Sequence, residues 1–290
     1  MAASIAYLGP PGSYTEDAAI AYAAWLNEST GEEISLHPAA SISQALKESQ
    51  NGRAQFSVVP VENSVEGSVS MTLDTLWQLE SLQVQRALVL PISHALISCA
   101  SSLDALQRVY AHPQGLAQCQ TWLERVIPQA QLIPTSSNTE SLQHLQAEVM
   151  SGAIASQRAA ELYHLPVLAH PINDYPDNCT RFWILSRQPS PGGRYTSLGF
   201  SVPANVPGAL VKPLQVFAER GINLSRIESR PTKRSLGDYL FFVDIEADAS
   251  KSAVQAALNE LEKYVETLKV LGSYSIMPIG EHPHSPPGST

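Results

Sequence analysis

The 290-residue sequence has few cysteines and no long apolar stretch. Its three cysteines, Cys99, Cys119 and Cys179, lie far apart and form no C-x-x-C pair, which argues against a disulfide framework or a structural zinc site. No apolar run approaches the roughly 20 residues that span a bilayer, and the N-terminus lacks the basic region of a signal peptide. We therefore expect a cytoplasmic globular protein with no bound metal and no membrane association.

Basic residues are scarce in the first two thirds of the chain. Residues 1–186 contain seven Lys or Arg against 17 Asp or Glu, a net charge of −10, while the whole chain carries −9. Such a surface repels nucleic acid, so we expect no nucleic-acid partner. An anionic substrate bound here would depend on backbone N–H groups, hydroxyls and one or two arginines.

Short apolar runs alternate with helical patterns through residue 186, which predicts an α/β domain with a mostly parallel sheet. The expected strands are 4–8, 56–59, 83–90, 94–98, 109–111, 131–133, 152–155 and 181–186. The expected helices are 16–26, 42–51, 68–79, 114–126, 139–147 and 156–163, with Thr15, Ser43, Thr139 and Ser156 as N-caps. About 185 residues are enough for two lobes with a cleft between them.

Residues 187–194 contain two prolines and two glycines and are predicted to be a linker. From 195 to 278 the pattern is strand, helix, strand, strand, helix, strand, the βαββαβ order of a ferredoxin-like domain. Its expected elements are 195–202, 208–220, 224–230, 238–246, 251–263 and 268–276. The tail 279–290, rich in proline and glycine, is predicted to be disordered.

Two glycine-containing loops follow buried strands in the first domain. In 7–15, Gly12 and Ser13 precede a helix whose N-terminal N–H groups could meet an anion, although a plain strand–helix turn explains the same residues. In 58–67, two acids, an amide and a hydroxyl precede Gly67, at the end of a strand where α/β sheets place ligands. A helix-capping turn is the alternative for this second loop.

Two further stretches carry polar side chains at strand ends. In 111–120, His112 is either an acid–base group or a helix-end residue that orients the loop, and we favour the second role. In 177–185, Thr180 and Phe182 would face one side of a strand and Arg181 the other. A threonine at the start of a strand is by itself also explained by β-propensity.

Taken together and in this order, the motifs resemble the prephenate dehydratase family with a C-terminal ACT regulatory domain. The matching segments are Gly9–Gly12, Pro60–Gly67, His112–Gln118 and Asn178–Phe182, then Gly208–Leu210, Gly221–Leu224 and Ile227–Pro231. The resemblance covers about 270 of the residues and implies a two-lobed, periplasmic-binding-protein-like catalytic domain at 1–186. It also implies conversion of prephenate to phenylpyruvate, with loss of carbon dioxide and water and without a cofactor.

By resemblance, Thr180 is the main catalytic candidate, and the chemistry fits because the departing hydroxide needs a hydrogen-bond or proton donor. Arg181 is a candidate anchor for a carboxylate, although strand alternation could direct it into a structural pair. The remaining catalytic candidates are Asn63, Ser64 and Gln114. The substrate-binding candidates are Gly12, Ser13, Glu62, Gly67, His112, Asn178 and Phe182, with Glu62 and Glu66 interpreted as structural or lobe-bridging because their charge opposes a dianion.

For the ACT domain the resemblance implies L-phenylalanine binding and a homodimer or homotetramer. The candidate contacts are Gly208, Ala209, Leu210, Asn223, Leu224, Ile227, Glu228 and Ser229. We expect Glu228 to be an interface or hinge residue, because its charge opposes the effector's carboxylate. Deletion of 195–290 is expected to leave an active enzyme that no longer responds to phenylalanine, provided that the remaining lobes stay soluble.

Three rival functions share these features. Arogenate dehydratase catalyses the same elimination on the transaminated substrate and has the same motifs. A non-enzymatic solute-binding protein would normally carry an export signal, and a regulatory protein with a dead catalytic domain would have lost the motifs. Phenylpyruvate formation from prephenate tests the solute-binding alternative, and a parallel assay on prephenate and arogenate separates the two dehydratases.

Overall fold

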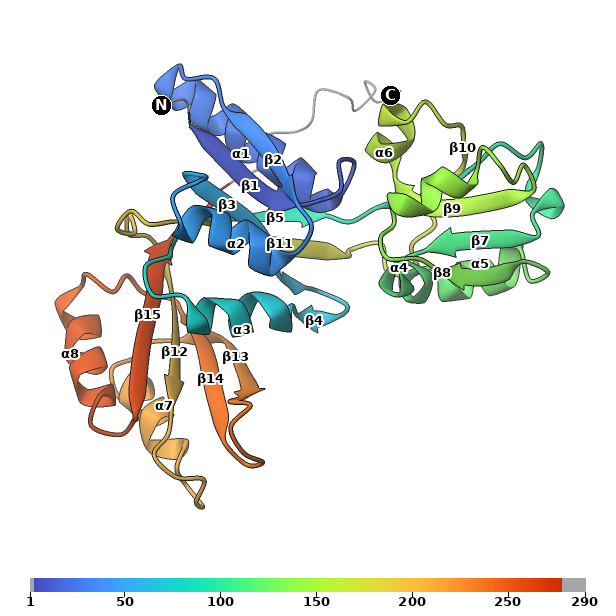
Figure 1. Cartoon of the computed structure of the whole chain (residues 1–290). Helices are drawn as coiled ribbons and strands as arrows, with labels where there is room; N and C mark the ends of the chain where they lie inside the picture. The colour runs from blue at the N-terminus through green and yellow to red at the C-terminus, as the bar shows by residue number, and fades with distance from the viewer. Residues whose placement is uncertain (1–2, 278–290) are drawn as a thin grey trace, which may run out of the picture.

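The computed structural model describes residues 3–277, which form three sheets (Figure 1). Two α/β lobes, lobe 1 and lobe 2, lie side by side, and a third domain lies below lobe 1 in the view of Figure 1. The two-lobed α/β prediction is confirmed. No helix among these residues is long and apolar enough to cross a membrane.

Lobe 1 is built on the first sheet, whose strand order is β16-β5-β11-β3-β1-β2, with β4 paired to β3. Its strands are β1 Ser4–Leu8, β2 Ser35–Ala39, β3 Phe56–Asn63, β4 Gly67–Ser68, β5 Gln83–Pro91, β11 Cys179–Ser186 and β16 Ile276–Met277. Its helices are α1 Tyr14–Thr30, α2 Ile42–Gln50 and α3 Ser70–Gln78. Apolar residues of α1 pack on one face of this sheet, and those of α2 and α3 pack on the other.

Lobe 2 is built on a sheet of order β10-β6-β9-β7-β8. Its strands are β6 His94–Ser98, β7 Arg108–Ala111, β8 Gln131–Pro134, β9 Ser151–Ser156 and β10 Val167–Ala169. Its helices are η1 Leu103–Ala105, α4 Pro113–Gln118, α5 Gln120–Val126, η2 Glu140–His144 and α6 Gln157–Leu162.

The chain passes between the lobes twice, once between β5 and β6 and once between β10 and β11. The two crossings are hydrogen-bonded to each other: the Ile92 N–H donates to the carbonyl of Asn178 at 2.8 Å, and the Ile172 N–H donates to that of His94 at 3.0 Å. Both lobes are therefore held at one hinge, and the residues beside it are fixed relative to both.

The third domain has the predicted ferredoxin-like plan. Its elements are β12 Tyr195–Ser201, α7 Val211–Ala218, β13 Leu224–Pro231, β14 Tyr239–Ile245, α8 Ser252–Leu261 and β15 Thr267–Tyr274. The antiparallel sheet has the order β13-β14-β12-β15, and α7 and α8 cover one of its faces (Figure 1).

The other face of this sheet packs on lobe 1. Phe242 and Tyr274 share one apolar core with Leu73 and Trp183 of lobe 1, and Trp77 meets Phe242 edge-on at 6.1 Å. The chain then returns to lobe 1, where β16 pairs with β5 and Met277 is buried. Removal of 195–290 would expose this core, so the structure argues against the expectation that the truncated chain remains an active enzyme.

Several sequence expectations need correction. The sheets of the lobes are mixed, not mostly parallel, because β11 runs antiparallel between β3 and β5, and β6 is antiparallel to β9. Strand β2 was missed because it contains Pro38, which is tolerated at the edge of a sheet, and the three-residue edge strand β10 was missed because it is so short. The predicted tail, 279–290, lies outside the described residues.

Helix boundaries also differ. The segment 139–147 contains a short 3-10 helix, and 114–126 is divided at Cys119 into two helices. Ser13 and Ser41 cap α1 and α2, two residues before the predicted caps, whereas Ser156 caps α6 as predicted.

Candidate active site

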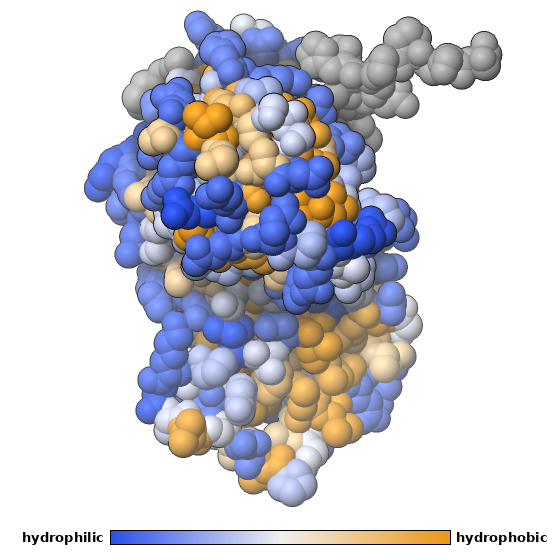
Figure 2. All heavy atoms as spheres, turned by 90° about the vertical axis from the view of Figure 1, so that its right-hand side faces the viewer, coloured by the Kyte–Doolittle hydropathy of each residue, from blue (hydrophilic) through white to orange (hydrophobic). Residues whose placement is uncertain are grey.

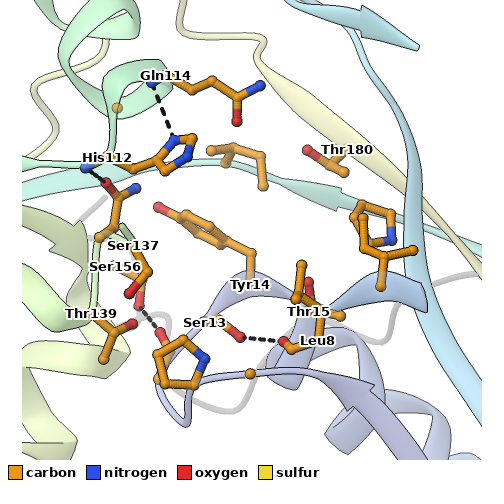
Figure 3. Close-up of a pocket in the computed structure, with 18 of the residues that line it drawn as sticks. Leu8, Ser13, Tyr14, Thr15, His112, Gln114, Ser137, Thr139, Ser156 and Thr180 are labelled. Atoms are coloured by element: carbon orange, nitrogen blue, oxygen red, sulfur yellow. Dashed lines mark hydrogen bonds between the residues drawn. The ribbon is translucent and has the colours of Figure 1, made fainter. Parts of the chain in front are cut away.

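A cleft of about 1000 Å³ lies between the two lobes. Its lobe 1 wall comes from the β1–α1 loop, the end of β3, the β4–α3 segment and the start of β11. Its lobe 2 wall comes from the start of α4, the loop 136–140 and the N-cap of α6. Figure 3 shows the side chains of His112, Gln114, Tyr14 and Thr180 around this space.

Asn63 and Thr180 form a cross-strand pair at the cleft, at the end of β3 and the beginning of β11. Asn63 Nδ2 donates to Thr180 Oγ1 at 2.9 Å, and Asn63 Oδ1 accepts the N–H groups of Val65 and Glu66, each at 2.9 Å. Because Thr180 is the acceptor in this bond, its own hydroxyl proton remains available to a ligand in the cleft.

The β1–α1 loop brings a helix start to the cleft. Ser13 caps α1 by accepting from the N–H of Glu16 at 3.2 Å. Gly12 has a φ of +86°, and a Cβ there would lie 3.2 Å from Ala159 Cβ of lobe 2, so the close approach of the two lobes favours glycine. Gly12 was predicted to serve a ligand-binding loop, and the structure adds this contact between the lobes.

Ion pairs close the lobes beside this loop. Arg158 of α6 contacts Glu16 at 2.7 Å and Asp17 at 2.8 Å, and Ser156 Oγ donates to the carbonyl of Gly12 at 3.1 Å. Burial pushes the pKa of Glu16 upward, but hydrogen bonds from the Gly12 N–H, Tyr7 and Arg158 outweigh it and hold that pKa below its usual value. Glu16 is therefore ionised at neutral pH and binds the lobes together.

The cleft lining contains no lysine or arginine. Two helices start at the cleft instead: α1 begins at Tyr14, and α3 begins at Ser70 with no side-chain cap. Free N–H groups in such first turns bind carboxylates. The lining also holds two acids, Glu66 and Glu140.

Eight of the predicted site residues line the cleft. They are Gly12, Ser13, Asn63, Gly67, His112, Gln114, Thr180 and Phe182. The sequence motifs thus converge on one site although they span 170 residues of chain.

Four predicted site residues are not part of the lining, namely Glu62, Ser64, Asn178 and Arg181. Arg181 points to the opposite face of β11, where it contacts Glu62 at 3.3 Å and Asp244 of β14 at 3.5 Å. Strand alternation explains this placement, so a role as carboxylate anchor is incorrect for Arg181, and Glu62 is its structural partner. Ser64 Oγ accepts from the Cys179 N–H at 2.9 Å and fastens β3 to β11. Asn178 is buried and bonded to Asn63.

His112 has the orienting geometry that the sequence favoured. Its Nδ1 accepts from the N–H of Gln114 at 3.3 Å, at the start of α4, and its own N–H donates to Asn138 Oδ1 at 2.9 Å. Burial lowers the pKa of His112 despite the charge of Glu66. The imidazole is therefore neutral at pH 7.

Sequence reasoning missed three residues of the site. Tyr14, His94 and Gln118 lie in the lining and bond to one another: His94 Nε2 is 2.9 Å from Gln118 Oε1, and Tyr14 OH is 3.1 Å from His94 Nδ1. The only sequence feature that pointed to these three residues was Gln118, which lies one helical turn after Gln114. Burial raises the pKa of Cys119 to about 12, so this thiol is a packing residue and not a nucleophile.

The predicted phenylalanine contacts lie in the third domain, at the α7 approach and along β13. Gly208 has a φ of +83° with open space around its Cα, and Leu210 occupies the N-cap position of α7 and packs on the domain core. Ile227 is 48% exposed on β13. These residues are separate from the cleft.

The fold and site define a class: a two-lobed α/β enzyme with an interlobe cleft, joined to an ACT-type regulatory domain. Family models match in this order, "Prephenate dehydratase" over residues 5–190 and "ACT domain" over 196–263. The chain belongs to the prephenate dehydratase family.

Curated relatives agree. A prephenate dehydratase of Lactococcus lactis is 35% identical over 96% of this chain and 99% of its own length. A bifunctional chorismate mutase/prephenate dehydratase of Aquifex aeolicus is 39% identical, over 93% of this chain and 73% of its own length.

Solved structures share the whole architecture. The prephenate dehydratase of Arthrobacter aurescens in complex with L-Phe has a TM-score of 0.82 and 34% identity, over 94% of this chain and 89% of that one. GqqA, described as a novel type of quorum-quenching acylase, has a TM-score of 0.79 and 27% identity, over 95% and 98% of the two chains. Because one fold carries two described activities, the site must decide the function.

Proposed function

We propose that this chain converts prephenate to phenylpyruvate in L-phenylalanine biosynthesis, and that L-phenylalanine controls it through the ACT domain. One observation carries the catalytic part. The Thr180 hydroxyl, held by Asn63 as an acceptor, presents its proton to a cleft that has helix starts and no lysine or arginine in its lining. This cleft suits a small dicarboxylate with a poor leaving group.

The reaction breaks two bonds on opposite sides of the prephenate ring. The ring carboxylate leaves as carbon dioxide, its bonding electrons move through the ring, and the hydroxyl departs from the opposite carbon and takes up a proton to become water. Aromatisation drives the step, but hydroxide is a poor leaving group. Thr180 donates a hydrogen bond to that oxygen as negative charge develops on it, which lowers the barrier.

The two carboxylates need different surroundings. The pyruvyl carboxylate is retained, and the first turns of α1 and α3 offer it fixed N–H donors. The ring carboxylate leaves more readily from a poorly solvated wall. Leu8, Val69, Ile92 and Phe182 supply apolar surface in the same cleft.

Arogenate dehydratase is the second candidate, and one observation favours it. Arogenate carries an ammonium group where prephenate has a keto oxygen, and the acids Glu66 and Glu140 line the cleft. A carboxylate would bind that ammonium and repel the prephenate side chain.

The regulatory part rests on how β13 contacts lobe 1. Successive side chains of a strand face opposite sides. Arg226 and Arg230 face lobe 1, while Ile227 and Ser229 face outward. Arg226 contacts Asp244 of the neighbouring strand β14 at 2.8 Å and Ser68 of lobe 1 at 3.5 Å. Ser68 itself lines the cleft. A shift of β13 upon effector binding would therefore move the wall of the active site.

We infer that L-phenylalanine binds at the exposed side of this strand, near Asn223, Leu224, Ile227 and the 208–210 turn. The Asn223 carbonyl is used within the sheet, where it accepts the N–H of Glu246 at 2.9 Å, but its side chain is exposed. Glu228 and Arg230 lie on the lobe 1 face and would transmit the change.

A homodimer or homotetramer is part of the proposal. Five large apolar side chains are exposed on the third domain, namely Val206, Val211, Ile227, Leu236 and Tyr239. Figure 2 shows apolar surface over the lower part of the molecule, where this domain lies. A second copy of the ACT domain would cover part of it. The proposal keeps 1–186 as catalytic domain, 187–194 as linker and 195–278 as ACT domain, in a cytoplasmic enzyme.

Parallel assays decide between the two substrates. The purified chain is given prephenate or arogenate, and phenylpyruvate and phenylalanine are measured separately. We expect a higher kcat/KM with prephenate. A preference for arogenate that is lost in Glu66→Gln or Glu140→Gln would establish the second candidate.

A further inference from the structure

A chain of hydrogen-bonded side chains leads away from Thr180 into the protein. Asn63 Nδ2 donates to Thr180 Oγ1 at 2.9 Å and to Asn178 Oδ1 at 2.8 Å. Asn178 Nδ2 donates to Gln118 Oε1 at 2.9 Å, and the same oxygen lies 2.9 Å from His94 Nε2. Asn178, Gln118 and His94 are all buried, so solvent does not compete for these bonds.

Backbone groups fix the direction of the chain at its first end. Asn63 Oδ1 accepts two backbone N–H groups, those of Val65 and Glu66. The amide nitrogen of Asn63 must then face Thr180 and Asn178. It follows that Asn178 accepts with its oxygen and donates with its nitrogen, and that Gln118 presents its oxygen.

The same logic determines the tautomer of His94. An oxygen of Gln118 faces Nε2, so Nε2 carries a proton and donates it. Burial lowers the pKa of His94, so the ring is neutral and Nδ1 is an acceptor. Tyr14 OH donates its single proton to the carbonyl of Ser93 at 2.7 Å, and it lies 3.1 Å from the unprotonated Nδ1, with which that proton can at most be shared.

The chain also joins the two lobes. Asn63 and Tyr14 belong to lobe 1, Gln118 belongs to lobe 2, and His94 and Asn178 lie beside the two hinge crossings. The orientation of Thr180 therefore depends on groups from both lobes.

We propose that Gln118 and His94 are positioning residues for Thr180. Their hydrogen bonds fix the orientation of Asn178, and Asn178 in turn fixes the Asn63 amide. The Asn63 amide then donates to Thr180 Oγ1, so that the threonine proton is directed to the leaving hydroxyl. Neither side chain needs to touch the reacting bonds. The kinetic part of this inference rests on the proposed function, whereas the direction of the hydrogen-bonded chain does not.

Three substitutions of His94 separate donation from packing. His94→Gln keeps an N–H donor near Gln118 and should retain kcat within about 3-fold. His94→Leu removes the donor and should lower kcat about 10-fold or more with KM nearly unchanged. His94→Glu, which at neutral pH presents an acceptor to an acceptor, should be at least as impaired. His37→Gln, an exposed histidine on β2, is the matched control and should behave as wild type.

A measurement without substrate tests the chain directly. Nitrogen-15 chemical shifts of the His94 ring in the full-length protein should show Nε2 protonated and Nδ1 unprotonated at neutral pH. A ring protonated on Nδ1 alone would overturn the inference, as would a folded His94→Leu variant with more than half of wild-type kcat. If wild type releases no phenylpyruvate, the proposed function fails instead, and the ring-nitrogen result still decides the direction of the chain.

Discussion

Arg230 of the ACT domain holds Asp74 of lobe 1 through two bonds, Nε to Oδ1 at 3.0 Å and Nη2 to Oδ2 at 3.2 Å. Asp74 lies one turn inside α3, the helix whose start lines the cleft. Burial pushes the pKa of Asp74 upward, but hydrogen bonds from Arg230 and Lys233 outweigh it and keep that pKa below its usual value. This two-pronged contact joins the proposed sensor strand to the active-site wall.

Loss of the Arg230–Asp74 contact should weaken regulation. For Arg230→Lys, which keeps the charge but not the paired bonds, we expect kcat within about 3-fold of wild type and a reduced response to L-phenylalanine. Coupling energies of this kind are typically about 1–3 kcal/mol, so the ratio of activities with and without effector should fall several-fold. Calorimetry on the variant separates lost coupling from lost binding.

Arg194→Lys is the control for this experiment, because the contacts of Arg194, 3.9 Å to Glu246 and 5.7 Å to the centre of the Tyr195 ring, are made within the third domain. An Arg230→Lys enzyme with wild-type phenylalanine response would show that the signal does not pass through this contact.

Thr180→Ala should lower kcat about 100-fold or more while KM changes little. The reason is that the substitution removes the only proton that the Asn63–Thr180 pair presents to the cleft. Thr180→Ser keeps the hydroxyl and should recover most of the activity. If the alanine variant retains half of wild-type kcat with its fold intact, Thr180 is not the donor.

Much of the site could be predicted from the sequence because the motifs lie at the ends of recognisable strands. The four segments meet at one cleft, and alternation along β11 correctly separates Thr180 and Phe182 from Arg181. The proposed role of Arg181 as anchor for a substrate carboxylate was wrong. A dianionic substrate suggested that a cationic side chain must bind it, but the cleft offers the N-terminal N–H groups of α1 and α3 for this purpose. The ferredoxin-like order was visible because amphipathic helices and alternating strands each leave a periodic signal.

Other features leave no local pattern. His94 opens an ordinary apolar strand, and its role comes from Gln118 and Tyr14, which are distant in sequence. The return of β16 to the sheet of lobe 1 involves only two residues. Tertiary pairing of this kind has no periodicity in the sequence, so the integration of the ACT domain with the first sheet could not be predicted.

Stability should fall on acidification through the histidines. Burial lowers the folded-state pKa of both His94 and His112 below the ordinary value of 6.5. At a pH below 6.5 the unfolded chain therefore binds more protons than the folded chain. The contribution of these two histidines to the free energy of unfolding is fully present above pH 6.5. It is lost as pH falls through the depressed values. The urea concentration at the unfolding midpoint should decrease as the pH is lowered from 7.5 to 5, and it should depend less steeply on pH in His94→Gln. The same pH dependence in His94→Gln as in wild type would contradict the burial argument.

Chelation should leave activity intact. Among residues 3–277, no three His, Cys, Asp or Glu side chains are grouped to hold a metal ion. We expect dialysis against EDTA to change kcat by less than about 2-fold, since the proposed elimination uses hydrogen bonds and helix starts. Inactivation that added zinc or magnesium reverses would refute this expectation.

The central claim is tested most directly by following phenylpyruvate release from prephenate with and without L-phenylalanine, on the full-length chain. We predict turnover without added metal or cofactor, and a rate that L-phenylalanine lowers. The coupling must be reciprocal, so prephenate should shift the apparent affinity for L-phenylalanine by the same factor when both effects are on binding. Absence of phenylpyruvate, or a rate that saturating L-phenylalanine leaves unchanged, would contradict the account.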